Sequence, residues 1–254
     1  MTTNRLRELL ARGEVAFGGW CSSGSPITTE ILATEGYDYV CVDLQHGVAG
    51  PDTLLPTLLA MGRTGATPVV RVATNDEAAI GRALDLGAEA IIVPMIDDPD
   101  AATRAAAACR YPPLGVRSYG PTRSRLFLNQ SSTDEVDRQV QCFVMIETRA
   151  AVEQAAAICA SPGIDGVYVG PADLALSYGR TPGSTGADSD VEKAIESVRL
   201  ACLDAGIVPA IHTANGVEAR RRIAQGFAMA TVGTDTGHFR TVVAQQLRLA
   251  RGDA

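Results

Sequence analysis

Two acidic residues stand at the ends of apolar runs, where a pair of carboxylates could hold a metal ion. Glu147 follows the run CFVMI at 142–146, and Asp173 follows the run GVYVGPA at 166–172. Runs of this kind are typical of strands buried on both faces, and a carboxylate at the carboxyl end of such a strand can reach a site shared with neighbouring strands. Two carboxylates without clustered histidine or thiolate ligands suit a hard divalent cation such as Mg²⁺ or Mn²⁺, which keeps open positions for water and substrate oxygens.

Four more ionisable residues lie within or just after other apolar runs, namely Asp43, His46, Arg71 and His212. Buried charges are costly unless they are paired or bound to a metal, so this group calls for a common partner. A divalent cation together with an anionic substrate would supply it. Asp43 lies three residues before His46, a spacing from which it could orient the imidazole ring.

Each of these residues also has a purely structural interpretation. Glu147 could cap a helix that starts at 148, and Asp173 could be the N-cap of the turn at 171–173. His46 could be a hydrogen-bonded core histidine, Arg71 a buried ion-pair partner, and His212 either a packed strand residue or a contact to a substrate. Because they all fall on or at the ends of predicted strands, the set as a whole favours a catalytic site.

Eight β-rich runs alternate with alanine-rich amphipathic segments along the chain. The runs lie at 15–20, 37–42, 68–72, 90–95, 142–146, 166–169, 208–212 and 229–233, and helices are predicted at 26–35, 75–86, 99–109, 150–159 and 190–205. Helices are expected to end in left-handed geometry at Gly36, Gly87, Gly206 and Gly226. This alternation predicts parallel pairing, and eight such units closing on themselves give an α/β TIM (β/α)8 barrel. An open doubly wound sheet is the nearest alternative, but no GxGxxG follows the first run.

The length of 254 residues and the 46% hydrophobic content fit a single barrel domain at 1–254. One connection, at about 112–140, is unusually long for the link between a helix and the fifth strand. It is interpreted either as a surface excursion or subunit contact, or as a loop over the barrel mouth whose Arg117, Arg123 and Arg125 meet an anionic substrate. A C-terminal helix is predicted at about 241–252.

Composition narrows the class of partner. The net charge of −7 argues against nucleic-acid binding and against attraction to an anionic membrane, because both use clustered basic residues. Small-molecule substrates remain. The six cysteines show no CxxC pairing, and several lie inside apolar runs, which favours reduced thiols and a cytoplasmic location. Residues 1–13 contain no apolar leader and no run is long enough to span a membrane, so neither export nor anchoring is expected.

The motifs DLQHG, PVVRV, ALDLGAEAIIVPM, RYPPLGVRS, MIETRAAVE and GVYVGPADLA occur in this order over nearly the whole chain, which thereby resembles the HpcH/HpaI aldolase family. The resemblance implies a TIM barrel and a metal-dependent class II pyruvate aldolase, similar to 4-hydroxy-2-oxoheptanedioate aldolase. Such an enzyme reversibly cleaves 4-hydroxy-2-oxo acids to pyruvate, or a related 2-oxo acid, and an aldehyde. The resemblance further implies Mg²⁺ or Mn²⁺, with Co²⁺ as a third candidate, and aromatic compound catabolism. It also implies a homohexamer in which the C-terminal helix swaps onto a neighbour, although a helix that closes its own barrel is an equal alternative.

By the same resemblance, His46 is expected to be the catalytic base and Arg71 to stabilise the transition state. Glu147 and Asp173 are expected to bind the metal. Asp85, in ALDLG, resembles an acidic position that raises the basicity of the histidine. Substrate contacts are expected from Arg71, Gly170, Ala172, Met145 and His212, with Ala172 acting through its backbone N–H.

A separate argument from the residues also favours a metal. An aldolase needs either a metal ion or a lysine Schiff base to accept the electron pair that develops on the carbonyl oxygen. The chain has one lysine, Lys193, in the segment DVEKAIE at 190–196, which is predicted to be a solvent-facing helix. A Schiff-base mechanism is therefore disfavoured.

Three positions depart from the family pattern. Met145 stands where relatives often carry a glutamine that touches the substrate, Gln45 where glutamate is also common, and His212 where an apolar residue is expected. The donor half of the site therefore matches the family better than the acceptor half. An oxaloacetate decarboxylase, an acyl-CoA carbon-carbon lyase and a non-catalytic keto-acid-binding barrel remain as alternatives.

Overall fold

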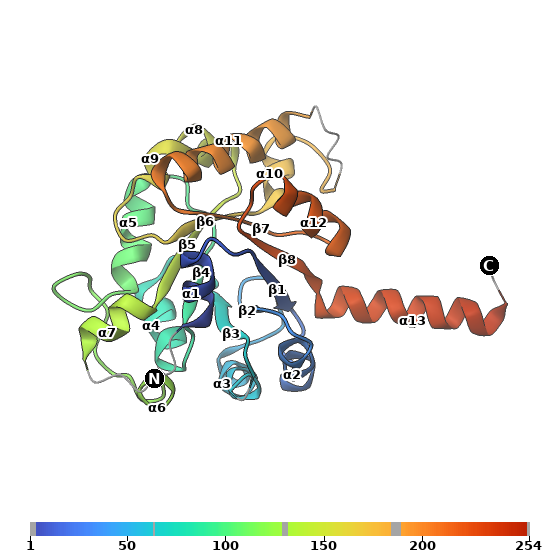
Figure 1. Ribbon diagram of the computed structural model, residues 1–254, viewed down its shortest axis with the longest axis horizontal. Coiled ribbons are helices and arrows are strands. Elements are labelled where there is room, and N and C mark those ends of the chain that lie inside the picture. Colours follow the sequence, from blue (N-terminus) through green and yellow to red (C-terminus); the bar gives the residue numbers. More distant parts are fainter. Residues whose placement is uncertain (1–3, 63, 129–131, 184–188, 253–254) are drawn as a thin grey trace.

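Eight parallel strands pair in sequence order and close into a barrel, so the predicted TIM barrel is confirmed (Figure 1). The computed structural model describes residues 4–62, 64–128, 132–183 and 189–252. The strands are β1 (Ala16–Cys21), β2 (Tyr39–Asp43), β3 (Thr67–Arg71), β4 (Ala90–Val93), β5 (Gln141–Ile146), β6 (Gly166–Val169), β7 (Val208–Ile211) and β8 (Met229–Thr234). Each overlaps one of the eight predicted runs, and the bounds of β6 agree with the prediction at both ends.

Helices follow the strands and surround the barrel. They are α1 (Arg5–Ala11), α2 (Pro26–Thr34), α3 (Pro51–Ala60), α4 (Glu77–Asp85), α5 (Pro99–Ala108), α6 (Ser124–Leu128), α7 (Thr133–Gln139), α8 (Arg149–Glu153), α9 (Ala155–Cys159), α10 (Pro171–Ser177), α11 (Asp190–Ala205), α12 (Gly216–Ala224) and α13 (Asp235–Arg251). The helix predicted at 150–159 is divided at Gln154 into α8 and α9. All four glycines expected to end helices have positive φ, between 70° and 105°.

Two apolar layers hold the barrel together. The outer layer lies between the strands and the helices, and the inner layer fills the barrel itself. Helix α1 closes the amino-terminal end of the barrel, because Leu6 and Leu9 pack into the inner layer. The inner layer also requires Gly18: a Cβ atom there would lie 1.9 Å from the Tyr39 ring, so only glycine lets that ring cross the barrel.

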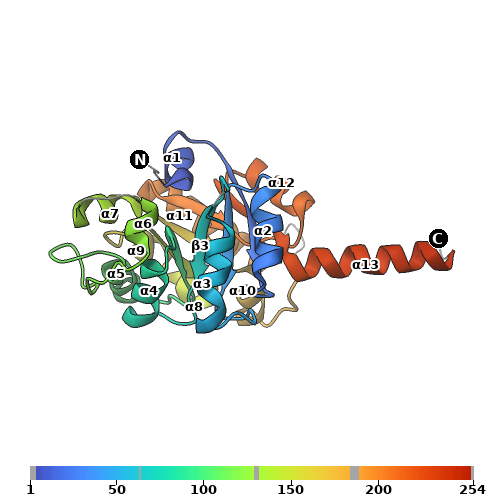
Figure 2. The same ribbon diagram turned by 90° about the horizontal axis from the view of Figure 1, so that it is seen from below.

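The long connector at 112–140 lies at the amino-terminal end of the barrel, away from the mouth formed by the carboxyl ends of the strands. It joins the end of α5 to the start of β5 and contains α6 and α7, which Figure 2 shows toward the same end as α1. Arg117 donates to Asp85 at 2.8 Å, and Arg123 donates to the backbone oxygen of Leu86. The interpretation as a loop over the mouth is therefore wrong, because a helix-to-strand link in a barrel must run at the end where the strands begin.

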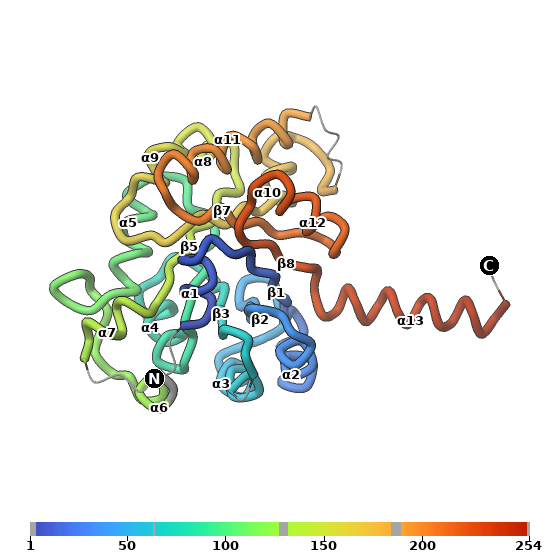
Figure 3. Tube along the Cα trace, viewed as in Figure 1, coloured from blue at the N-terminus to red at the C-terminus, as the bar shows by residue number. Residues whose placement is uncertain are grey.

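Helix α13 extends away from the barrel as an isolated arm (Figures 1 and 3). It begins at Asp235, six residues before the predicted start, and its residues from Thr241 onward are all exposed within this chain. Asp235 itself is buried and accepts hydrogen bonds from Ser22, Ser23 and Thr28, so the root of the arm is tied to the end of β1.

The remaining expectations concern thiols and membranes. All six cysteines are free and buried. In the described ranges, no helix combines the length and hydropathy that a membrane span requires.

Candidate active site at the carboxyl ends of the strands

Glu147 lies directly after β5 and is almost completely buried, with 1% of its surface exposed. Its Oε1 atom accepts a hydrogen bond of 2.8 Å from the backbone N–H of Met95, which follows β4. Burial raises the pKa of Glu147, the Met95 N–H opposes that shift, and the negative charge of Asp173 raises the pKa further. The carboxylate is thus held in a site where a nearby cation would favour its charged form.

The backbone on both sides of Glu147 is shaped to approach it closely. Met95 has φ = 55°, in the left-handed region that non-glycine residues rarely adopt, and this conformation accompanies the N–H contact to the carboxylate. On the other side, a Cβ atom at Gly170 would lie 2.5 Å from Oε2 of Glu147. Gly170 is therefore required for this approach, and its backbone lies beside the Glu147 carboxylate.

Asp173 lies in the first turn of α10, which follows β6, and is half-buried. Neither carboxylate serves as a helix cap: Thr148 is the N-cap of α8 and Gly170 is the N-cap of α10. Asp173 makes no hydrogen bond or ion pair with any other residue that the structure describes. The exposed Ala172 precedes it in the first turn of the helix, where backbone N–H groups have no partner within the helix.

Arg71 and Asp43 form a buried ion pair on the other side of the mouth. They are register partners on β3 and β2, and Arg71 donates to both carboxylate oxygens, at 2.8 Å from Nε and 2.5 Å from Nη2. Burial alone would raise the pKa of Asp43, but the hydrogen bonds and charge of Arg71 outweigh it and the net shift is downward. The indole of Trp20 completes the cluster: it donates to Asp43 at 3.2 Å, and the guanidinium carbon of Arg71 is 5.0 Å from its ring centroid.

His46 lies on the loop after β2, with its side chain exposed. Asp43 accepts hydrogen bonds from the backbone N–H groups of Gln45 and His46, at 3.0 and 3.2 Å. The expectation that Asp43 orients the imidazole ring is therefore corrected: the carboxylate holds the backbone of the loop and the Arg71 guanidinium. The loop geometry keeps His46 at the edge of the mouth.

Asp85 is not brought to His46 within one chain. It is the last residue of α4, next to the start of β4, whereas His46 follows the end of β2. The two residues thus belong to opposite ends of the barrel, and the carboxylate of Asp85 accepts a hydrogen bond from the buried Arg117. A direct effect of Asp85 on His46 in the same chain is excluded by this placement, because the strands separate them.

His212 follows β7, and its ring meets the Trp20 ring edge-on at a centroid distance of 4.8 Å. Burial lowers the pKa of His212 to about 4, the positive charge of Arg71 adds to this shift, and Asp43 opposes it. Met145 points into the inner layer, with its sulfur 4.0 Å from Nη1 of Arg71. Both residues thus belong to the cluster around Trp20 and Arg71.

The sequence interpretation missed three contributors to this site. Trp20 connects Asp43, Arg71 and His212, and it could have been noticed as the single tryptophan at the end of the first strand run. The Met95 N–H had no sequence signal, because its role depends on a backbone conformation. Asp97 accepts a hydrogen bond from Thr148, and its negative charge also raises the pKa of Glu147.

These residues fit a hard divalent ion. Glu147 offers Oε2 beside the Gly170 backbone, and Asp173 makes no hydrogen bond or ion pair with a described residue. The two negative charges destabilise each other in the absence of a cation. No group of three or more His, Cys, Asp or Glu side chains in the described chain is arranged to hold a metal. The two carboxylates would therefore supply only part of a coordination sphere, with water and substrate oxygens supplying the rest.

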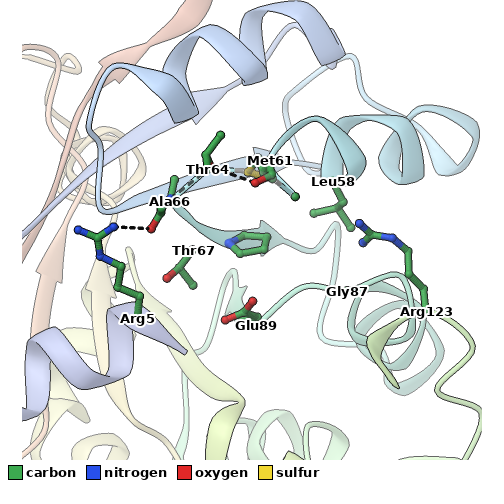
Figure 4. Close-up of a pocket in the computed structure, with 12 residues that line it drawn as sticks. Arg5, Leu58, Met61, Thr64, Ala66, Thr67, Gly87, Glu89 and Arg123 are labelled. Carbon is green, nitrogen blue, oxygen red and sulfur yellow. Dashed lines mark hydrogen bonds between the residues drawn. The ribbon is translucent and has the colours of Figure 1, made fainter. Parts of the chain in front are cut away.

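A separate cavity of about 250 Å³ lies at the opposite end of the barrel (Figure 4). Glu89 lies between Arg5 and Arg123 in its wall, and burial raises the pKa of Glu89 to about 7. The cavity contains none of the mouth residues and lies next to the starts of β3 and β4. It therefore plays no part in the site described above.

Comparisons with known proteins agree with this architecture. The family model described as HpcH/HpaI aldolase/citrate lyase matches residues 16–241. A 5-keto-4-deoxy-D-glucarate aldolase from Klebsiella pneumoniae subsp. pneumoniae is 32% identical over 240 residues, covering 94% of this chain and 93% of the relative. The crystal structure of an HpcH/HpaI aldolase/citrate lyase family protein from Burkholderia cenocepacia J2315 superposes with a TM-score of 0.92 at 32% identity, covering 98% and 100% of the two chains. An HpcH/HpaI aldolase from Desulfitobacterium hafniense DCB-2 gives 0.89 at 25% identity, covering 97% and 96%.

A closed barrel with a buried arginine on β3 and acidic residues after β5 and β6, all at the carboxyl ends of the strands, defines the class of TIM-barrel enzymes, whose active sites lie at this face. The chain belongs to the HpcH/HpaI aldolase/citrate lyase family. It is a carbon-carbon lyase of the aldolase class, which acts on a hydroxy-keto acid.

Proposed function

We propose that this protein is a divalent-metal-dependent aldolase that reversibly cleaves 4-hydroxy-2-oxo acids to pyruvate, or a closely related 2-oxo acid, and an aldehyde. The observation that carries the proposal is the buried Glu147, which accepts a hydrogen bond from one N–H group and senses the charge of a second carboxylate, Asp173, that has no hydrogen-bond or ion-pair partner among the described residues. The curated relative that acts on 5-keto-4-deoxy-D-glucarate supports the substrate class.

Glu147 and Asp173 would hold the ion, with Mg²⁺, Mn²⁺ or Co²⁺ as candidates. When bound, a divalent ion supplies Lewis-acid polarisation of the substrate carbonyl, which makes the adjacent carbon acidic. The protein contributes the fixed carboxylates and the exclusion of water around the buried Glu147. The backbone N–H of Ala172 is available to bind the substrate carboxylate, since Leu174 is the first residue of α10 that donates back to Gly170.

In the cleavage direction, His46 accepts the proton of the 4-hydroxyl group as the bond between C3 and C4 breaks. The aldehyde leaves, and the electron pair of that bond forms the enolate of pyruvate. Arg71, held in position by both oxygens of Asp43, donates N–H groups toward the developing negative oxygen. A proton then returns to C3 to give the methyl group of pyruvate, and synthesis follows the reverse path.

The test is exchange of the pyruvate methyl protons in D₂O, followed by proton NMR with and without Mn²⁺ or Mg²⁺. We expect rapid exchange that is lost with a chelator and restored by the metal. His46→Ala should slow exchange by about 10²–10⁴-fold. Direct Mn²⁺ binding, measured by electron paramagnetic resonance, should survive in His46→Ala and weaken strongly in Glu147→Gln.

Glu153→Gln is the matched control, because Glu153 is an exposed glutamate on α8 that forms an ion pair with Arg149, which is also exposed. It should bind Mn²⁺ and exchange protons like the unchanged protein. Full exchange in chelator-treated protein, or in His46→Ala, would refute the proposal. Faster turnover of oxaloacetate than of 4-hydroxy-2-oxo acids would identify a decarboxylase instead.

The acyl-CoA alternative loses its support. It relied on arginines of the 112–140 connector as contacts for the phosphates of CoA. Arg117 and Arg123 are buried and engaged at the opposite end of the barrel, so they are not available to a ligand at the mouth. Arg125 lies on α6 of the same connector, with its guanidinium carbon 5.7 Å from the Tyr119 ring centroid.

We also propose a homo-oligomer, with a hexamer as the expected form, in the cytoplasm. The arm formed by α13 exposes Phe239, Val242, Val243, Leu247 and Leu249, with exposed fractions between 48% and 72%. An exposed apolar stripe on an isolated helix is a common mark of a protein interface, and a second copy of the chain is the natural partner. The net charge of −7 and the six buried thiols support small-molecule substrates without nucleic acid or membrane partners.

A further inference from the structure

The barrel mouth has two halves with different chemistry. The ends of β3, β5 and β6 carry the charged residues Arg71, Glu147 and Asp173, which serve the oxo acid. The ends of β7, β8 and β1 carry the segments 212–215, 232–238 and 21–24, which read HTAN, VGTDTGH and CSSG. The second half contains no lysine or arginine, and its one acid, Asp235, is already bonded to serine and threonine hydroxyls.

In this second half, His212 has ring nitrogens that are free to form hydrogen bonds with a ligand. Its ring contacts Trp20 through an edge-to-face packing contact, which satisfies neither ring nitrogen. No described residue forms a hydrogen bond with the His212 ring. The ring nitrogens are also not among the fully buried side-chain atoms that lack a partner, so they are accessible. The ring nitrogens are therefore open to the mouth.

The protonation state of His212 follows from its surroundings. The groups that face it are the cation of Arg71 and the anion of Asp43, and burial acts in the same direction as Arg71 to keep the ring neutral near pH 7. A neutral imidazole offers one N–H donor and one nitrogen acceptor. It can bond a hydroxyl group in either sense, but it cannot neutralise a carboxylate as an arginine would.

We propose that His212 selects the acceptor, and that the acceptor is an uncharged aldehyde with a hydroxyl group, which His212 binds by a hydrogen bond. This inference rests on the proposed aldolase function. In this inference the half of the mouth formed by β7, β8 and β1 recognises the aldehyde, and the half formed by β3, β5 and β6 binds the oxo acid. Ser22 and Thr236, whose hydroxyls lie 2.8 Å apart at the rim, add to the polar and uncharged character of this half.

The test compares kcat/KM for condensation of pyruvate with glycolaldehyde and with acetaldehyde, which differ by one hydroxyl group. In His212→Leu the ratio of the two values should fall about tenfold relative to the unchanged protein, the effect of losing one hydrogen bond to an uncharged group. His212→Asn keeps a donor and an acceptor and should retain part of the ratio. Because each ratio is compared between proteins, the intrinsic reactivity of the two aldehydes cancels.

Gln225→Leu is the control, since it also replaces a hydrogen-bonding side chain by leucine, but at the exposed C-cap of α12, at the end of the barrel opposite the mouth. Its ratio should equal that of the unchanged protein. The inference is overturned if His212→Leu leaves the ratio unaltered or reduces both values equally. It is also overturned if the unchanged protein prefers glyoxylate to glycolaldehyde.

The outcomes separate this inference from the proposed function. If the unchanged protein fails to exchange the pyruvate methyl protons in the presence of metal, the aldolase proposal itself fails. If it exchanges them and condenses aldehydes but the ratio does not depend on residue 212, only the role of His212 fails. Should His212→Leu not fold, His212→Asn and His212→Gln provide the same comparison.

Discussion

Two imidazoles at the barrel mouth have opposite surroundings and therefore opposite uses. His46 is exposed on a loop whose backbone is held by Asp43, so its ring is free to meet substrate and to exchange protons with solvent. His212 is packed on Trp20, and its pKa is lowered to about 4. An exposed imidazole suits proton transfer, whereas a buried neutral one suits recognition.

The lowered pKa of His212 predicts how stability depends on pH. In the unfolded chain the ring takes up a proton near its ordinary pKa of 6.5, but in the folded chain it resists protonation down to about pH 4. The unfolded state thus binds more protons in this window, so the free energy of unfolding should decrease as the pH falls from 6.5 to 4. Urea denaturation at pH 7.5 and 5 should show a smaller decrease in His212→Leu than in the unchanged protein. An equal decrease in both would contradict the assignment, and His46→Ala serves as the comparison variant.

Residue types at strand ends were enough to predict which side chains lie at the barrel mouth. The carboxylates at 147 and 173 could be placed at the mouth because a buried parallel strand has only one carboxyl end. The contacts of Asp43 could not be derived, since its partner Arg71 belongs to the next strand and the pairing depends on register. Spacing along the chain suggested that Asp43 orients the imidazole of His46. Asp43 does bind His46, but through the backbone N–H of that residue.

At the scale of the secondary-structure elements, the turn after β4 places a residue with a strained backbone next to the candidate metal site. Met95 has its left-handed conformation there, and its N–H holds Glu147. Its side chain is about half exposed, so packing does not explain the conformation.

Substitutions at this turn should separate the two roles of Met95. Met95→Gly permits the same φ and keeps the N–H, so we expect Mn²⁺ affinity within a few fold of the unchanged protein and a change in the free energy of unfolding of no more than about 1 kcal/mol. Met95→Pro imposes a negative φ and removes the donor, so Mn²⁺ binding should be greatly weakened. Titration with Mn²⁺ and urea denaturation measure both effects, and tight binding by Met95→Pro would show that the N–H contact is dispensable.

The eight strands could be predicted because each is a short apolar run bounded by polar residues. The helices were predicted less completely: no prediction covers α1, α3, α6, α7, α10 or α12. Helix α3 contains an internal Pro56 and ten residues with little charge, so its pattern is weak. For the connector at 112–140 the sequence left two interpretations open, and the alternative of a loop over the mouth is wrong: Arg117 bonds Asp85 and Arg123 bonds the backbone oxygen of Leu86.

For the molecule as a whole, the arm formed by α13 predicts that assembly can be removed without loss of the barrel. Its residues beyond Arg240 are exposed and lie outside the barrel, so deletion of 241–254 should leave the far-ultraviolet circular dichroism of the barrel largely intact. The mass measured by light scattering after size exclusion should fall to that of a smaller assembly or a single chain. Gln245→Glu is a control at a polar position of the same helix. An unaltered oligomer after truncation would show that other surfaces carry the assembly.

Asp235 gives the arm a fixed origin. It is the first residue of α13, and its carboxylate gathers the hydroxyl and amide groups that follow β1, at the seam where the first and last strands meet. A neighbouring chain that binds the arm would therefore act on residues at the rim of the mouth. The proposed assembly and the proposed aldehyde side of the mouth would thus both depend on Asp235, and a substitution at this seam should affect both.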